Sequence, residues 1–245
     1  MRDERPLCAV PRLVIASLVV ALTLQIAWQS TQPKPTARAE ELGAPPTIAS
    51  LNIASAGEHV ALAQLMTLYL QAFDNQPGVS IPFRDLDYPQ VIRWLATILQ
   101  LDPAGQYPLL MAAQVYSQVP DTVRERLMAD FVHAQFLQDP NRRWRWLAHA
   151  TIMAKHRLHD DALALRFARD ITRLAPAAPH WARQMQIFIL EDIGERESAK
   201  IMLGGLLAGG QIKDEHELHF LTQRLEAMKN DEKPTPLTRN RHPKQ

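Results

Sequence analysis

Residues 138–148 read QDPNRRWRWLA, and the outline of this stretch recurs along the chain. Its Asp-Pro step has counterparts at 101–103 (LDP) and 174–176 (LAP), so the three prolines lie about 37 and 36 residues apart. An aromatic residue follows each proline at a nearly constant offset: Tyr107, Trp144 and Trp181. Proline disfavours helix at the preceding residue but fits a first helical turn, so each step ends one helix and starts the next. A period in this range predicts stacked pairs of helices.

Composition agrees with a helical protein. Alanine and leucine are plentiful and glycine is sparse among the 245 residues, which favours an all-α fold. The formal net charge of +1 provides no general attraction to nucleic acid, and we expect no nucleic-acid partner. The single cysteine, Cys8, excludes an intrachain disulfide, and it precedes the apolar run that a lipoprotein cysteine would follow.

Outside the three repeat units, at 103–139, 140–175 and 176–211, further helices are expected. The first, from about Ser55 to Phe73, is apolar nearly all the way round, so we expect it to be buried on most sides. Residues 74–86 form a long loop. Asp87 is the expected cap of the next helix. The positions that we expect to face the core from there on are Val91, Leu95, Ile98, Leu99, Val123, Leu127, Phe131, Ala134, Ala164, Phe167, Ala168, Ile171, Leu174, Trp181, Met185, Phe188, Ala199, Met202, Leu203 and Leu206.

Two glycine pairs mark the end of the array. Gly204-Gly205 lies in the middle of an expected helix, where glycine costs about 1 kcal/mol relative to alanine, and close helix packing is the expected reason. Gly209-Gly210 is the expected end of that helix. A last helix over about 214–229 closes the array with one apolar face.

The N-terminal region contains the most apolar segment. Residues 13–28 read LVIASLVVALTLQIAW and carry no charge, and as a helix they rise about 24 Å. We interpret 13–29 as a transmembrane signal-anchor helix. A cleaved signal peptide and a soluble N-terminal helix are the alternatives; Ala37-Arg38-Ala39 resembles a cleavage site but lies far from the apolar run.

Flanking positive charges set the expected orientation. Arg2, Arg5 and Arg12 precede the run, whereas only Lys34 and Arg38 follow it closely. The positive-inside rule then predicts a short cytoplasmic tail at 1–12 and, for a bacterial cell, a single-pass inner-membrane protein with a periplasmic C-terminal domain. A proline-rich tether at 30–50 leads to the repeat domain at 51–229, and 230–245 is expected to be a disordered tail.

The helix pairs resemble tetratricopeptide repeats in degenerate form. The second unit carries the resemblance, with an early aromatic, small residues in both helices and a closing proline: Trp144, Leu147, Ala148, Ala162 and Pro176. The third unit matches through Trp181 and Ala199. The units exceed the family's usual length by two or three residues, and the first has Val123 near the place of the second-helix alanine. The resemblance implies a TPR-like α-solenoid of antiparallel hairpins that binds proteins or peptides.

A basic stretch is the candidate binding site. Residues 141–159 contain no acidic residue but five basic ones, at 142, 143, 145, 155 and 157. At helical spacing Arg142, Arg145, His149 and His156 share one face, suited to holding a carboxylate or an anionic polymer. The plainer interpretation is a solvated arginine face with tryptophans in the core.

Metal binding and catalysis have little support in the sequence. His156, His159, Asp160 and Asp161 are all competent metal ligands, but they straddle an expected turn, and helix capping by an aspartate explains the acids. We expect no metal site, no cofactor and no catalytic residue, because none of the common catalytic motifs is present.

The expected function is that of a membrane-tethered adaptor or scaffold, which is not an enzyme and which binds a partner protein or peptide in the periplasm. One alternative is a receptor for an anionic envelope polymer or lipid, acting through the basic stripe of the second repeat. Another is an envelope enzyme, or a noncatalytic subunit of one, with residues 74–86 as a lid. The basic middle of the chain and its acidic end also permit a homo-oligomer.

Overall fold

A computed structural model describes residues 11–32, 39–210, 212 and 214–230. The expectations for residues 1–10, for 33–38 of the tether and for the tail at 231–245 lie outside the described residues. The chain divides into two compact units. One comprises Met1–Glu40 and Asn75–Ser80, and the other comprises Glu41–Asp74 and Ile81–Gln245.

The first unit contains a long apolar helix. Helix α1 (Arg12–Thr31) begins one residue before the predicted segment and ends two residues after it. It is long and apolar enough to cross a membrane, with every described residue exposed. The hydroxyls of Ser17 and Thr23 donate to the carbonyl oxygens of Val14 and Val19 at 2.9 and 2.8 Å, so these polar groups are satisfied within the helix.

The same unit holds the one two-stranded sheet of the described chain, inside the predicted 74–86 loop. Strands β1 (Asn75–Gln76) and β2 (Val79–Ser80) pair in antiparallel register. Gly78 has φ +79°, as the third position of a turn after Pro77 requires. The Gln76 side chain hydrogen bonds to both the amide and the carbonyl of Glu40, at 2.7 and 3.0 Å.

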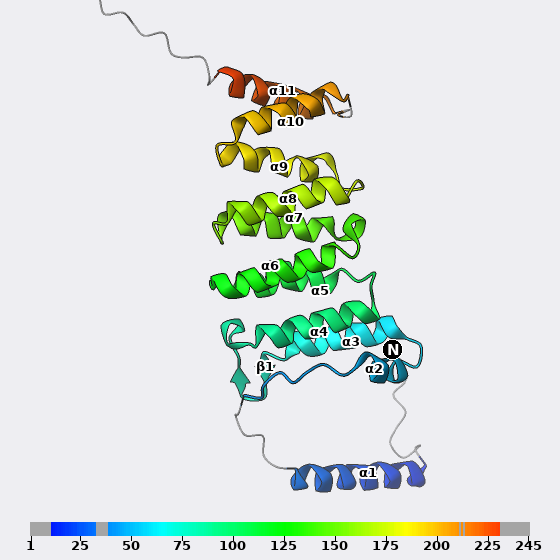
Figure 1. Ribbon diagram of the computed structural model, residues 1–245. Helices are drawn as coiled ribbons and strands as arrows, with labels where there is room; N and C mark the ends of the chain where they lie inside the picture. Colours follow the sequence, from blue (N-terminus) through cyan, green and yellow to red (C-terminus); the bar gives the residue numbers. More distant parts are fainter. Residues whose placement is uncertain (1–10, 33–38, 211, 213, 231–245) are drawn as a thin grey trace, which may run out of the picture. The chain divides into compact units, whose positions relative to one another are not determined.

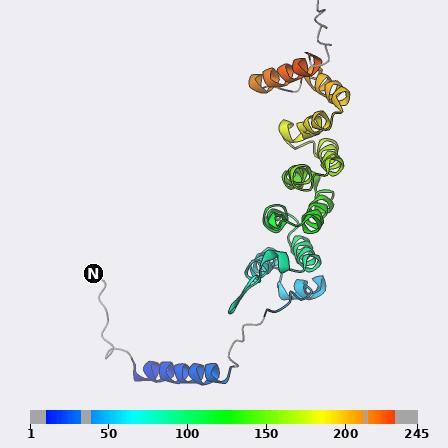
Figure 2. The ribbon, with the colours of Figure 1, turned by 90° about the vertical axis from the view of Figure 1, so that its left-hand side faces the viewer.

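The second unit is helical, and its helices pack mainly on their neighbours in the chain (Figure 1). In Figure 2 the helices from α3 to α8 are seen nearly end-on and alternate between two columns. The elements are α2 (Ile48–Ala54), α3 (His59–Ala72), η2 (Phe83–Asp85), α4 (Tyr88–Leu101), α5 (Tyr107–Leu110), the π-helical turn η3 (Met111–Val115), the 3-10 turn η4 (Tyr116–Gln118), α6 (Thr122–Phe136), α7 (Pro140–His156), α8 (Asp161–Leu174), α9 (His180–Asp192), α10 (Arg196–Ala208) and α11 (Glu215–Asn230).

Much of the predicted core is confirmed. Each of the following predicted side chains is buried: Val91, Leu95, Ile98, Leu99, Phe131, Ala164, Phe167, Ala168, Ile171, Ala199 and Leu203. Leu174, Met185, Phe188, Met202 and Leu206 are partly buried and pack against the core. Asp87 accepts from the amide of Gln90 and so caps α4, and Gly210 ends α10 at φ +61°. The start of α4 at Asp87 and the end of α10 at the glycine pair were both predicted.

The helix predicted from about 55 to 73 is present as α3, but the prediction that it is buried on most sides was wrong. It begins at His59, after Gly57 at φ +96°, and the separate short helix α2 precedes that turn. Helix α4 packs against one side of α3, but much of the remaining surface of α3 is exposed, with Leu65 at 62% and Leu68 at 61%. The end of the predicted tether instead packs on this unit, since Leu42 is buried and Trp94 Nε1 donates to the carbonyl of Gly43.

The inward face predicted for α6 was only partly correct, because Phe131 is buried and Leu127 packs against the core but the other two predicted residues do not. Val123 is 68% exposed and Ala134 is exposed, whereas Glu125 and Gln135 are buried. The buried face runs through Met128, Ala129, Val132 and Phe136. An apolar pattern misplaced this face because two polar side chains lie on it, each held by an arginine of a neighbouring segment.

Two further expectations need correction. Trp181 is 54% exposed, although it was placed in the core. A Cβ added at Gly204 or Gly205 would meet no atom within 4 Å, so close helix packing does not explain this glycine pair.

Candidate partner-binding surface

Alternate helices of the second unit contact one another directly. We call α3, α5 with η3, α7, α9 and α11 the first-helix row. Side chains about one repeat apart join each member to the next: Gln71 to Tyr107, Gln106 to Trp146, Gln114 to His149, Trp144 to Trp181, and Gln184 to Glu217. The row therefore presents one connected surface, whose linking contacts run from Gln71 to Glu217.

The four predicted binding residues all lie on the exposed face of α7. Arg142 forms an ion pair with Asp139 at 3.1 Å, and Arg145 lies 5.7 Å from the ring centre of Trp144. His149 contacts Gln114 at 3.0 Å, and His156 is exposed nearer the end of the helix. The structure thus brings them onto one side, although one arginine is already paired with a carboxylate.

The other basic residues of this stretch do not belong to that face. Arg143 is only 3% exposed, and Lys155 pairs with Asp192 at 2.6 Å. Arg157 pairs with the buried carboxylate of Glu125 and reaches the carbonyl of Val119. The dense positive charge expected from the sequence is therefore divided between an exposed face and the interior, which the linear pattern cannot distinguish.

Aromatic side chains extend the exposed face towards α9. The rings of Trp144 and Trp181 meet edge to face, with centroids 5.5 Å apart. Arg145 stacks on the first of them, and Ile152 is 49% exposed one turn beyond His149. Exposed tryptophan beside arginine is the composition of binding hot spots rather than of an ordinary solvated helix.

A small hollow of about 180 Å³ lies between α7 and α9. Ile152 and His156 line it from α7, and Met185 and Phe188 line it from α9. The ion pair between Lys155 and Asp192 is at its edge. The hollow can take one apolar side chain, so the predicted residue His156 borders an apolar subsite instead of an anion site.

A larger groove of about 580 Å³ lies between α3 and the start of α5. Sequence reasoning missed it. Gln64, Leu68 and Gln71 line it along α3, and Tyr107 faces them from α5. A polar and apolar alternation at positions 64, 68 and 71 on a supposedly buried helix was the available signal, because a buried face would carry no unpaired glutamine.

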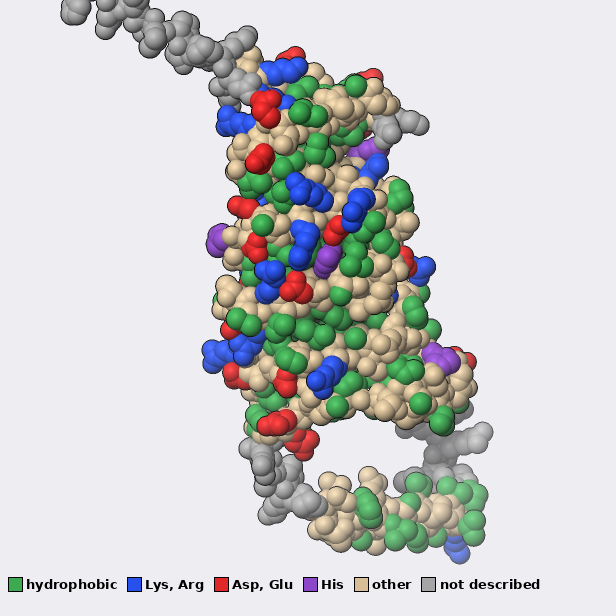
Figure 3. All heavy atoms as spheres, viewed as in Figure 1, with side chains coloured by type: hydrophobic (Ala, Val, Ile, Leu, Met, Phe, Trp, Pro, Cys, Tyr) green, Lys and Arg blue, Asp and Glu red, His purple; other side chains and the backbone are tan. Residues whose placement is uncertain are grey.

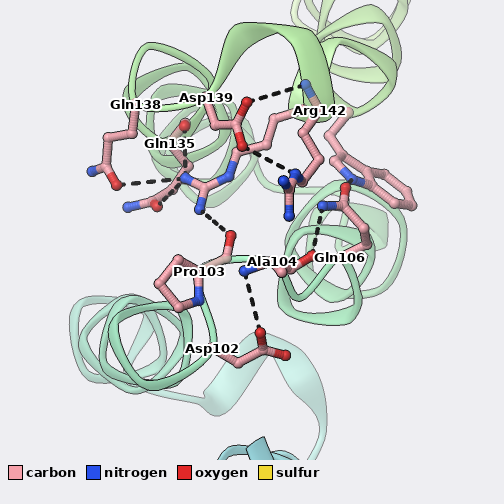
Figure 4. A network of polar contacts seen from close by, with 10 residues as sticks. Asp102, Pro103, Ala104, Gln106, Gln135, Gln138, Asp139 and Arg142 are labelled. Carbon is pink, nitrogen blue, oxygen red and sulfur yellow. Dashed lines mark hydrogen bonds and ion pairs between the residues drawn. The ribbon is translucent and has the colours of Figure 1, made fainter.

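One wall of the groove is held in place by α7 (Figure 4). Arg143 donates to the carbonyl of Pro103 at 3.1 Å and to Gln135 Oε1 at 2.9 Å. Trp146 Nε1 donates to Gln106 Oε1 at 2.7 Å, so two α7 side chains fix the loop before α5. Burial lowers the pKa of Arg143, while Asp139 opposes that shift, and the guanidinium stays charged.

The cluster around His156 to Asp161 has a structural explanation. Asp160 Oδ1 accepts from the amide of Leu163 and caps α8, while its Oδ2 accepts from Arg126 at 2.8 Å. His159 has φ +51° in the turn between the helices. Within the described residues, no three His, Cys, Asp or Glu side chains form a group that can hold a metal ion.

The helices that alternate with the first-helix row, such as α6 and α8, carry mixed charge. Figure 3 shows positive and negative side chains interspersed over the face that it displays. Arg126 pairs with Asp130 and Asp160, and His133 Nε2 lies 2.7 Å from Asp170.

No family model, curated protein or solved structure matches this chain.

Proposed function

We propose that this chain is a membrane-tethered, TPR-like scaffold that binds a partner protein or peptide through the first-helix row. The carrying observation is the connected surface of that row, with the half-buried Trp144 and the exposed Trp181 and Arg145 at its centre. Side-chain contacts that recur at separations of 33 to 40 residues support a solenoid of similar hairpins. In tetratricopeptide arrays the first helices line the binding groove.

In this proposal the apolar helix and the tether hold the second unit beside a membrane. Helix α1 anchors the chain, and the charges around it favour a periplasmic position for the second unit. An anchored scaffold raises the local concentration of its partner beside the bilayer. The scaffold needs no catalytic group of its own.

A partner that engages α7 should present an apolar or aromatic side chain together with a carboxylate. Trp144 and Trp181 offer flat apolar area, and Arg145 has no carboxylate partner among the described residues. Arg142 already has Asp139, so it contributes less net attraction. We therefore place the main contact at Arg145 and the tryptophan pair.

The test is crosslinking and affinity capture of the full chain from native membranes, followed by identification of the captured protein. Replacing Arg145 with Glu, or Trp181 with Ala, should reduce capture at least tenfold without loss of helicity. Arg169→Glu, an exposed change on α8, is the matched control and should leave capture unchanged. Equal capture by all variants would remove the proposal.

Salt dependence separates this function from binding of an anionic envelope polymer or lipid. A contact centred on two tryptophans and one arginine should weaken only slightly as salt is raised. An anionic polymer would be released steeply, because several charge contacts are screened together.

A further inference from the structure

The groove between α3 and α5 has a composition different from the rest of the first-helix row. Asp102 is the one charged residue among its lining side chains. Apolar contacts come from Leu68, Ile98 and Pro108, and hydrogen-bonding groups come from Gln64 and Gln71. A volume of about 580 Å³ is in the range of sites that enclose a ligand group.

One oxygen of the Asp102 carboxylate accepts a hydrogen bond, and the other is left for a ligand. Its Oδ1 accepts from the amide of Ala104 at 3.2 Å, which holds the side chain in the turn after α4. Its Oδ2 has no hydrogen-bond or ion-pair partner among the described residues. Figure 4 shows the Asp102 carboxylate beside Ala104 and away from Gln135. The guanidinium of Arg143 donates to the carbonyl of Pro103 and to Gln135, and it forms no ion pair with Asp102 among the described residues.

Two glutamines on α3 add complementary groups. Gln71 Nε2 donates to the hydroxyl of Tyr107. Within the part of the chain that the structure describes, Gln71 Oε1 has no donor, and the exposed Gln64 has no hydrogen-bond partner. A side-chain amide offers a donor and an acceptor together, as each peptide group of an extended chain does. Apolar Leu68 lies between the two glutamines on the same face.

From this arrangement we infer that the groove binds an extended peptide segment of the partner and selects a lysine or arginine side chain at Asp102. The inference rests on the proposed scaffold function and adds a specificity that the α7 surface does not have. A basic side chain of the peptide forms an ion pair with Asp102, the one charged residue that lines the groove. The glutamines bind the peptide backbone, and Leu68 contacts an apolar residue next to the basic one. An anionic polymer or lipid headgroup would be repelled by the same carboxylate.

The wall that carries Asp102 is held before any ligand arrives. Arg143 fixes Pro103, and Trp146 fixes Gln106, on either side of the turn that follows Asp102. A carboxylate that is already held in position loses little conformational entropy on binding. Most of the energy of its ion pair with a cation therefore contributes to the affinity for the peptide.

The test uses random linear peptides displayed on phage, selected against the full chain in detergent micelles. The wild-type chain should enrich peptides with a lysine or arginine beside an apolar residue. Asp102→Asn keeps the acceptor for the Ala104 amide and should lose that enrichment. Glu226→Gln, an exposed change on α11, is the charge-matched control and should retain it.

One enriched peptide then gives the magnitude. Its Kd for the wild-type chain should rise roughly tenfold or more when its basic residue becomes glutamine, and Asp102→Asn should remove that difference. Enrichment without basic residues, or enrichment unchanged by Asp102→Asn, overturns the inference and leaves the scaffold function standing. If the wild-type chain selects no peptide, the inference and the peptide-binding function both fail.

Discussion

Arg143 Nη2 donates a hydrogen bond to the carbonyl oxygen of Pro103 across 3.1 Å, joining residues 40 positions apart. The same guanidinium donates to the carbonyl and to the side chain of Gln135, so it ties α6, α7 and the turn before α5 together. Only 3% of Arg143 is exposed, and its Nε has no partner among the described residues. A charged residue from the basic stretch is therefore part of the core.

Replacing Arg143 with alanine should lower the free energy of unfolding by about 3 kcal/mol, because several buried acceptors lose their donor. Arg143→Lys should recover only part of the loss, since an ammonium does not reproduce the fork of the guanidinium. Chemical denaturation measures both values. Arg142→Ala, a change at an exposed neighbour, should cost less than about 1 kcal/mol. Equal effects at the two positions would contradict the assigned burial.

The basic stretch shows how far sequence reasoning reached. Spacing placed Arg142, Arg145, His149 and His156 on one helix face, and the structure agrees. Periodicity did not separate Arg143 from them, because the acceptors that compensate its burial lie at 103 and 135, in other helices and turns. Long-range polar pairing of this kind leaves no local signal.

The α3–α5 groove was missed for a related reason. A helix with apolar residues all round was expected to be covered, but coverage depends on whether another helix lies outside it. The glutamines at 64 and 71 were the sign of an open face, but the apolar residues around the rest of α3 do not show whether another helix covers them. Because α3 was predicted to be buried, Leu68 and Gln71 were not recognised as exposed residues.

Two glycines provide opposite tests of the backbone. Gly57→Ala should lower the free energy of unfolding by about 1 kcal/mol, because φ +96° is unfavourable for a residue with a Cβ. Gly204→Ala should raise it by a similar amount, since the added methyl meets no atom and alanine favours helix. Thermal unfolding followed by circular dichroism compares them. Destabilisation by Gly204→Ala would show that an unseen contact occupies that face.

Glu125 and Arg157 form an ion pair whose carboxylate side chain is only 4% exposed. Arg157→Ala leaves that carboxylate buried without its cation and should cost about 3 kcal/mol. Combining it with Glu125→Leu should restore part of the stability, because the double variant has no unpaired buried charge. Denaturant titration of the full cycle gives the coupling. Additive losses from the two changes would show that the pair is not energetically linked.

Alkaline pH should destabilise the packing of α4 against η4. Tyr88 donates its hydroxyl proton to the carbonyl oxygen of Tyr116 at 2.7 Å. Burial raises the pKa of Tyr88 to about 12, with Arg124 opposing the shift, and burial also raises the pKa of Tyr116 above its ordinary value. The unfolded chain therefore loses these protons first, so stability falls as pH rises above about 10.

Melting temperatures measured from neutral pH to pH 12 test this point. Tyr88→Phe should be less stable at neutral pH, because the carbonyl of Tyr116 loses its donor, but its melting temperature should decline less steeply above pH 10. Tyr69→Phe, at an exposed tyrosine on α3, should keep the wild-type slope. Parallel curves for all three proteins would show that Tyr88 does not titrate on unfolding.

The N-terminus of the mature protein decides whether α1 is an anchor. An uncleaved anchor predicts the mass of the full chain and retention in membranes after alkaline carbonate extraction. A cleaved signal predicts a shorter mass, with a start near residue 40 if the Ala-Arg-Ala stretch is used. We expect the full mass, because α1 continues to Thr31 without a small-residue site directly after its apolar core. Replacing Leu18 and Leu22 with arginine should release the chain into the soluble fraction, since two charges near the middle of the helix disfavour a membrane span.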